Sequence, residues 1–113
     1  MTDCLFCRIV AGEIPATVVH ETDEVLAFRD IAPQAPTHVV VIPKAHYADA
    51  AALTAADPAL AGRLLAAGAE VAAAEGLSDG YRFVVNTGAD GGQTVFHVHL
   101  HVLGGRAMTW PPG

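Results

Sequence analysis

The chain has 113 residues, of which 52% are hydrophobic and 16% are charged, and its formal net charge is −6. This length predicts a single domain, residues 1–113, and the high apolar content excludes an intrinsically disordered chain. The negative charge argues against a nucleic-acid partner, because a surface that binds nucleic acid needs basic residues to neutralise phosphates.

Nothing in the sequence predicts a membrane or secretory protein. No apolar run approaches the roughly 18 residues that span a bilayer. Asp3 and Glu13 lie where a signal peptide avoids acidic residues. We therefore expect a cytoplasmic protein without a membrane partner. Its small number of charges also favours burial of apolar surface against a second copy of the chain.

The first half of the chain predicts a short helix followed by three strands. Apolar residues recur at helical spacing over residues 4–11, between Asp3, a good N-cap residue, and Gly12. Residues 18–21 and 25–30 predict two strands joined by a tight polar turn. Residues 38–42 form an apolar run rich in β-branched side chains, which is typical of a central strand.

The second half predicts one long helix and two further strands. The alanine-rich residues 53–75 carry an apolar stripe, and the helix begins either at a capping box that includes Thr54 or at Asp57-Pro58. Residues 81–86 predict a strand, and a turn-rich loop leads into another over residues 97–103. About five strands with one long and one short helix, without regular βαβ alternation, indicate an α+β fold with an antiparallel sheet.

Three histidines, His97, His99 and His101, stand two residues apart in the last predicted strand. Side chains alternate along a strand, so the three imidazoles share one face while the aliphatic residues between them face the core. The ring nitrogens need polar partners. The pattern therefore predicts a site for a phosphate, a metal ion or both; a metal-only site and an exposed strand with incidental histidines are the alternatives.

The two cysteines, Cys4 and Cys7, form a C-x-x-C pair. In a cytoplasmic protein such a pair indicates a metal or redox site rather than a structural disulfide. The βαβ context of a thioredoxin-like site is missing. Zinc prefers four nitrogen or sulfur ligands, and His46 and His97 are the two histidines available to complete such a set.

The His-x-His-x-His pattern with apolar intervening residues resembles the motif of the histidine-triad (HIT) superfamily. Other segments, which together span nearly the whole chain, resemble its Hint branch: Phe28–Ile31, Pro36–His38, Val41–Lys44, Gly91–Thr94, Leu103–Arg106 and Trp110–Gly113. The resemblance implies a HIT-like fold whose sheet extends across a homodimer. It also implies the activity of a purine nucleoside phosphoramidase, a hydrolase of P–N bonds.

The resemblance assigns catalytic roles to four residues. His99 is the expected nucleophile, which attacks the α-phosphorus and forms a nucleotidyl-histidine that water then hydrolyses. A neutral imidazole suits this role, and we expect a backbone carbonyl to orient its other ring nitrogen. His101 is expected to donate to the phosphate oxygens, and His38 to orient the site or relay a proton. Thr94 replaces the usual serine and keeps the hydroxyl that helps to pass a proton to the leaving amine.

A nucleotide-binding set is implied as well. Asp30 is expected to accept hydrogen bonds from both ribose hydroxyls, because a carboxylate offers two acceptor oxygens to a vicinal diol. Asn86, Gly92 and Gln93 are expected near the phosphate, and Trp110 at the leaving group across the dimer interface. The expected purine pocket is apolar and consists of Leu5, Phe6, Ile9, Ile14, Phe28 and Ile31.

Some members of the superfamily bind a structural zinc, and the matching residues here are Cys4, Cys7, His46 and His97. Such a zinc would hold the strand that carries His99, and no cofactor would be required for the chemistry. The alternative is a metal-free site in which His97 supports the nucleophile. Other open functions are a dinucleoside polyphosphate hydrolase of the Fhit kind, a non-catalytic purine-nucleotide sensor and zinc storage.

Overall fold

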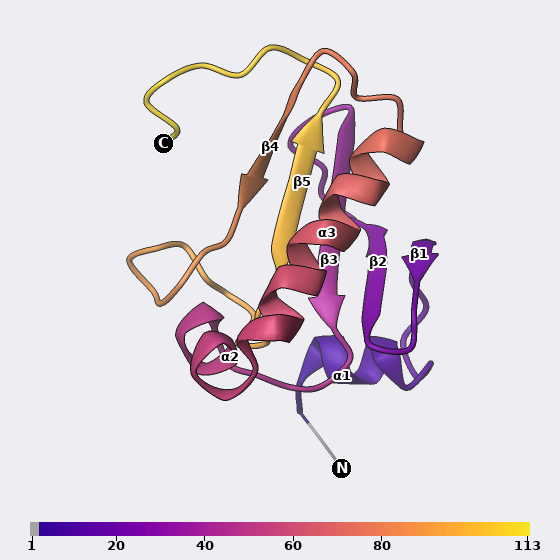
Figure 1. Cartoon of the computed structure of the whole chain (residues 1–113), viewed down its shortest axis with the longest axis vertical. Coiled ribbons are helices and arrows are strands. Elements are labelled where there is room, and N and C mark those ends of the chain that lie inside the picture. The colour runs from indigo at the N-terminus through magenta and orange to yellow at the C-terminus, as the bar shows by residue number, and fades with distance from the viewer. Residues whose placement is uncertain (1–2) are drawn as a thin grey trace.

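The computed structural model describes residues 3–113, which form one five-stranded sheet with helices packed against it (Figure 1). In chain order the elements are α1 (Leu5–Val10), β1 (Val18–Glu21), β2 (Val25–Arg29), β3 (Thr37–Pro43), α2 (Ala50–Ala56), α3 (Pro58–Ala74), β4 (Tyr81–Val84) and β5 (Leu100–Gly104). The strands pair antiparallel in the order β1-β2-β3-β5-β4. The predicted α+β fold is therefore confirmed, with β3 at the centre of the sheet.

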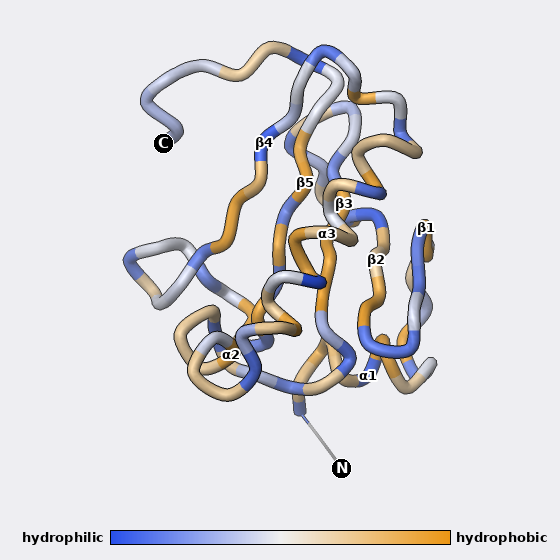
Figure 2. The backbone as a smooth tube through the Cα atoms, in the orientation of Figure 1, coloured by the Kyte–Doolittle hydropathy of each residue, from blue (hydrophilic) through white to orange (hydrophobic). Residues whose placement is uncertain are grey.

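Each face of the sheet has its own apolar cluster. Helix α3 covers one face (Figure 1), and the residues of β3 and β5 that are buried in its cluster are Val39, Val41, Leu100 and Val102. On the opposite face, Val40 packs with Phe6 of α1. Val40 is paired with His101 of β5, so the histidine lies on the same face as Phe6. The turn between β1 and β2 is hydrophilic, as expected for a solvent-exposed connection (Figure 2).

The alanine-rich segment forms two helices rather than one. Asp57 ends α2 and caps α3, because its carboxylate accepts a hydrogen bond from the N–H of Leu60 and Pro58 occupies the first turn. The Thr54 capping box does not form, since its hydroxyl donates to the carbonyl of Ala50 within α2. Of the two predicted helix starts, Asp57-Pro58 is therefore correct for α3, and α2 is an additional short helix.

The histidine strand is shorter than predicted. Strand β5 begins at Leu100, because backbone groups just before it bond outside the sheet: the N–H of Val98 donates to the carbonyl of Tyr47, and the carbonyl of His97 accepts from a side chain. The alternation of side chains nevertheless continues through this segment, and Val98 is buried in the same cluster as Leu100. Within the described residues, no helix is both long and apolar enough to cross a membrane.

Candidate functional site

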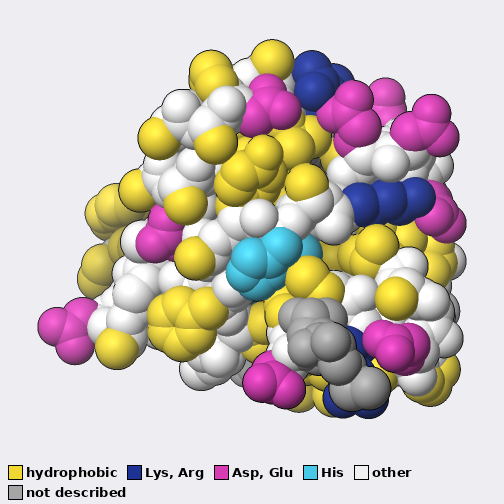
Figure 3. All heavy atoms as spheres, turned by 90° about the horizontal axis from the view of Figure 1, so that it is seen from below, with side chains coloured by type: hydrophobic (Ala, Val, Ile, Leu, Met, Phe, Trp, Pro, Cys, Tyr) yellow, Lys and Arg dark blue, Asp and Glu magenta, His cyan; other side chains and the backbone are white. Residues whose placement is uncertain are grey.

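At the lower end of the sheet in Figure 1, where α1 lies, two cysteines and two histidines come together. Cys4 is the N-cap of α1, Cys7 lies in its first turn, His46 follows β3 and His97 precedes β5. Their four donor atoms all lie within 4.8 Å of one another. Figure 3 shows histidine exposed among hydrophobic side chains on this underside of the molecule. The structure thus assembles a donor set from segments up to 93 residues apart.

The distances in this cluster match a tetrahedral metal site. The Nδ1 atom of His97 lies 3.4 Å from Cys4 Sγ, 3.5 Å from Cys7 Sγ and 3.2 Å from His46 Nδ1. A tetrahedron with ordinary zinc bond lengths places nitrogen–nitrogen and nitrogen–sulfur pairs about 3.3–3.6 Å apart. His97 donates from Nε2 to the carbonyl of Pro43 at 2.8 Å, so its lone pair is on Nδ1 and faces the cluster. Burial lowers the pKa of His97, which favours the neutral, ligating form. These four residues therefore fit a structural zinc.

His97 also orients the central histidine of the triad. The Nδ1 atom of His99 lies 2.7 Å from the main-chain carbonyl oxygen of His97. A carbonyl only accepts, so the hydrogen of His99 is on Nδ1 and its lone pair is on Nε2. His99 is buried and its ring packs edge-on against Phe6, with centroids 5.0 Å apart. The result is an imidazole with a fixed orientation and with Nδ1 as the hydrogen-bond donor, as a histidine nucleophile requires.

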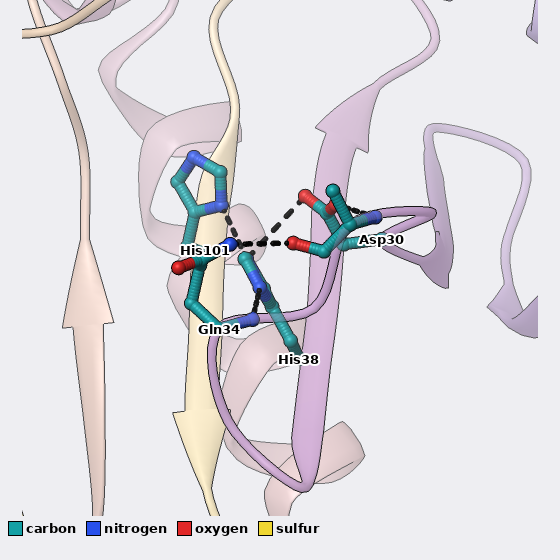
Figure 4. Close-up of polar contacts among 5 residues, drawn as sticks. Asp30, Gln34, His38 and His101 are labelled. Atoms are coloured by element: carbon teal, nitrogen blue, oxygen red, sulfur yellow. Dashed lines mark hydrogen bonds and ion pairs between the residues drawn. The ribbon is translucent and has the colours of Figure 1, made fainter.

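The hydrogen of His101 is placed by a chain of hydrogen bonds that begins at a backbone amide (Figure 4). The N–H of Gln34 donates to Nδ1 of His38 at 3.0 Å, so His38 carries its hydrogen on Nε2. That nitrogen lies 2.8 Å from Nδ1 of His101, which must accept. His101 therefore carries its own hydrogen on Nε2 and can donate it to a ligand. The rings of His99 and His101 are neighbours, with centroids 4.9 Å apart.

Burial affects the protonation of His101 and His38. Burial, together with the neighbouring His99 and His38, lowers the pKa of His101 to about 4, while Asp30 partly opposes this shift. The pKa of His38 is also lowered by burial, against the opposing charge of Asp30. His101 is therefore neutral near pH 7. It offers one N–H donor to a phosphate rather than a positive charge.

Asp30, His38 and His101 also lie close enough to suggest a second metal cluster. Their hydrogen bonds disagree with that interpretation. Both nitrogens of His38 are already used, and a metal at its Nε2 would require the loss of the hydrogen shared with His101. This group fits a hydrogen-bonded relay.

A cavity of about 510 Å³ opens between α1 and the sheet, and its lining residue Phe6 packs against the ring of His99. It brings together the expected ribose ligand Asp30 and the whole expected purine set: Leu5, Phe6, Ile9, Ile14, Phe28 and Ile31. Asp30 Oδ1 accepts from the N–H of Ala32, and Oδ2 lies 3.5 Å from Nε2 of His38. Residues 15–17, Arg29 and Val40 also line the cavity and were not predicted. The alternation of β3 could have indicated Val40, which lies two residues from His38.

The remaining predicted site residues lie apart from this cavity in the single chain. Gln93 is buried, and its amide donates to the carbonyls of Ala48 and Val95 and accepts from the N–H of Gly88. Its side chain thus anchors the loop. Thr94 is exposed, and Asn86 is half-buried next to Gly92, whose φ of +87° favours glycine. Trp110 is 82% exposed. Their contacts with substrate stay predictions.

Comparison with known proteins identifies the family. The HIT domain model matches residues 11–108 of the chain. The chain belongs to the HIT domain family. This HIT protein is 55% identical over 111 residues to a HIT-like protein of Synechococcus elongatus, covering 98% of this chain and 97% of the relative.

Two further matches extend the comparison. A 14 kDa zinc-binding protein of Brassica juncea is 48% identical over 113 residues, covering 98% of this chain and all of the relative (100%). The crystal structure of a HIT family hydrolase from Legionella pneumophila Philadelphia 1 matches with a TM-score of 0.95 and 55% identity, covering 98% of this chain and 100% of that one. The protein therefore has the fold of a HIT family hydrolase.

Proposed function

We propose that this HIT protein is a hydrolase that cleaves the P–N bond of purine nucleoside 5′-phosphoramidates, as the Hint branch does. Aminoacyl- and lysyl-adenylates are further candidate substrates. The observation that carries the proposal is a pair of ring contacts in the triad: Nδ1 of His99 meets the His97 carbonyl, and Nδ1 of His101 meets Nε2 of His38. These contacts assign a lone pair to Nε2 of His99 and a hydrogen to Nε2 of His101. A nucleophile for phosphorus, Nε2 of His99, thus lies beside a hydrogen-bond donor for the phosphate oxygens, Nε2–H of His101. Both are next to an apolar cavity.

In the proposed reaction, Nε2 of His99 attacks the α-phosphorus and the bond to the amine breaks. The amine departs with a proton passed to it with the help of the Thr94 hydroxyl. His101 donates its Nε2–H to a non-bridging oxygen, where negative charge is greatest. Water then attacks the nucleotidyl-histidine, releasing a nucleoside monophosphate and restoring the neutral imidazole. Oriented imidazoles supply the positioning that phosphoryl transfer requires.

The base and ribose have matching surroundings. The purine would occupy the cavity lined by Phe6, Phe28 and Ile31, and the Asp30 carboxylate would accept from the ribose hydroxyls. Phe6 both lines this cavity and packs against His99, so a bound purine and the nucleophile would be separated by one side chain. This spacing suits attack at the α-phosphorus of a nucleoside 5′-phosphate derivative.

We also propose that the cysteine–histidine cluster holds one zinc ion with a structural role. When bound, zinc would fix the segment that carries the nucleophile, since the side chain of His97 belongs to the cluster and its main-chain carbonyl accepts from His99. The zinc-binding relative from Brassica supports this assignment.

A homodimer would complete the site. Strand β4 is an edge strand, and the exposed apolar side chains on or beyond it include Tyr81, Val85, Phe96 and Trp110. The C-terminal segment extends outward past β4 (Figure 1). A second copy at this edge would extend the sheet, and Trp110 would reach the leaving group in the partner's site.

Substrate comparison tests the assignment. The purified protein is assayed with adenosine 5′-phosphoramidate and with diadenosine triphosphate, and kcat/KM is compared. We expect the phosphoramidate to be preferred. Preference for the dinucleotide would indicate a hydrolase of the Fhit kind. Binding of AMP without turnover of either compound would indicate a nucleotide sensor, and stoichiometric metal without nucleotide binding would indicate zinc storage.

A further inference from the structure

Arg106 lies outside both the cavity and the metal cluster, yet it is bonded to the loop that precedes His38. Its Nη2 and Nε donate to the carbonyl oxygen of Gln34 at 3.1 and 3.4 Å, and its Nη1 donates to the carbonyl of Ala107 at 3.2 Å. The side chain is exposed, so it is not needed to fill the core. The contact joins the end of β5 to a residue 72 positions earlier.

The backbone before Arg106 is shaped to make this contact. Gly105 has a φ of +88°, and a Cβ atom on it would lie 2.9 Å from Cβ of Pro36 and 3.6 Å from the nitrogen of Thr37. Any larger residue would be strained and would push the two segments apart. Glycine thus lets the end of β5 approach the loop, which brings the guanidinium to the Gln34 carbonyl.

Gln34 is the residue through which this loop acts on the histidines. Its N–H donates to Nδ1 of His38, while its side-chain amide donates to the carbonyl of Ala32 at 2.9 Å. If the N–H moved away, His38 could carry its hydrogen on Nδ1 instead. His101 would then donate from Nδ1 and present a lone pair, rather than a hydrogen, at Nε2. A lone pair there would repel a phosphate oxygen.

We propose that Arg106 is a positioning residue: by holding the Gln34 carbonyl it keeps the Gln34 N–H on His38, and so keeps the hydrogen of His101 on Nε2. The other titratable groups that face this chain are Asp30, 3.5 Å from His38, and the ring of His99, 4.9 Å from His101. Asp30 approaches His38 at Nε2 and His99 lies beside His101, whereas the Gln34 N–H binds Nδ1 of His38. The inference deepens the proposed function and rests on it, because His101 needs this hydrogen only for a phosphate ligand.

The first test reads the tautomers directly. Histidine labelled with ¹⁵N gives long-range ¹H–¹⁵N spectra that distinguish a protonated from an unprotonated ring nitrogen, without any substrate. Wild-type protein, Arg106→Ala and Arg106→Lys are compared. Arg63→Ala is the matched control, because Arg63 carries the same charge, is exposed as Arg106 is, and donates to the Glu24 carboxylate rather than to the loop before His38.

We expect wild type and Arg63→Ala to show one tautomer for His38 and His101, with the hydrogen on Nε2. Arg106→Ala should show a mixture, and Arg106→Lys, which keeps one donor, an intermediate state. A wild-type spectrum for folded Arg106→Ala would overturn the proposal. If that variant does not fold, the lysine variant decides in the same way.

The second test connects the tautomer to the reaction. With adenosine 5′-phosphoramidate, kcat/KM of Arg106→Ala should fall about 10-fold, with partial rescue in Arg106→Lys and no change in Arg63→Ala. Altered spectra with unchanged kcat/KM, or equal losses in Arg63→Ala, would overturn the positioning role. If wild-type protein cleaves no phosphoramidate, the proposed function fails, while the spectra still decide whether Arg106 sets the tautomer.

Discussion

His99 and His101 stand two residues apart but carry their hydrogens on different ring nitrogens. The difference comes from their partners: a main-chain carbonyl accepts from His99, and the Nε2–H of His38 donates to His101. Two identical side chains thereby acquire complementary roles. The sequence pattern predicts that the rings share a face and that a backbone carbonyl orients His99, and the structure confirms both. The tautomer of His101 depends instead on the N–H of Gln34, whose position no local pattern reveals.

Burial of His101 makes stability depend on pH. Because its pKa falls from 6.5 to about 4 on folding, the unfolded chain binds a proton between these values that the folded chain does not. The contribution of neutral His101 to the free energy of unfolding should therefore be fully present above pH 6.5 and should be lost as the pH falls towards 4. His101→Asn keeps an acceptor for His38 and removes the titration. Urea unfolding at pH 7 and 4.5 should show a smaller acid loss in the variant; equal losses would refute this assignment.

At the level of elements, local patterns identify the strands better than their ends. The apolar alternation predicts β1 to β4 to within two residues. It misses the late start of β5, because the backbone just before Leu100 bonds outside the sheet, for example from the Val98 N–H to the Tyr47 carbonyl. It also merges α2 with α3, since alanine carries little periodic signal. The break at Asp57 is predictable from capping chemistry alone.

Asp57 should be the most sensitive helix cap, because it ends α2 and begins α3. Asp57→Ala removes the acceptor for the Leu60 N–H and should lower the free energy of unfolding by about 1 kcal/mol. Urea denaturation of the variant measures this loss. Asp90→Ala, in an exposed loop, serves as the control and should match wild type. If Asp57→Ala has the same free energy of unfolding as wild type, packing alone fixes the boundary between α2 and α3.

Across the whole molecule, the metal cluster ties α1 to the segment before β5. The four ligand types are visible in the sequence, but their meeting depends on the family resemblance, since His46 and Cys7 are 39 residues apart. The Arg106–Gln34 contact has no sequence signal, because its acceptor is a backbone carbonyl. Long-range contacts to main-chain atoms are the part of the site that sequence analysis misses.

Removal of the metal should destabilise the entire domain. We expect one zinc per chain by elemental analysis, and a lower Tm after treatment with a chelator. Zinc at 100 times its Kd stabilises a fold by about 2.7 kcal/mol, so the shift should be several degrees. Before treatment, Cys7→Ser should have a lower Tm than wild type, and its Tm should fall less when the chelator is added. Metal-free protein with the Tm of the purified form would contradict a structural zinc.

The exposed apolar side chains beyond β4 predict self-association. Sedimentation velocity at micromolar concentration should show a dimer, and Trp110→Ala should reduce kcat/KM for a phosphoramidate without loss of the fold. Leu65→Ala, an exposed apolar residue of α3, is the control and should leave both the dimer and the activity unchanged. A monomer at these concentrations would exclude a site shared between two copies.

The central claim is that His99 carries the nucleotide during turnover. Rapid quenching of the reaction with adenosine 5′-phosphoramidate, followed by intact-protein mass spectrometry, measures this most directly. We predict that wild type gains the mass of one adenylyl group, located on His99. His99→Asn, which keeps a donor for the His97 carbonyl, should bind AMP, gain no mass and lose at least about 1,000-fold in kcat. Turnover of wild type without an adduct, or near-normal turnover of His99→Asn, would contradict the account.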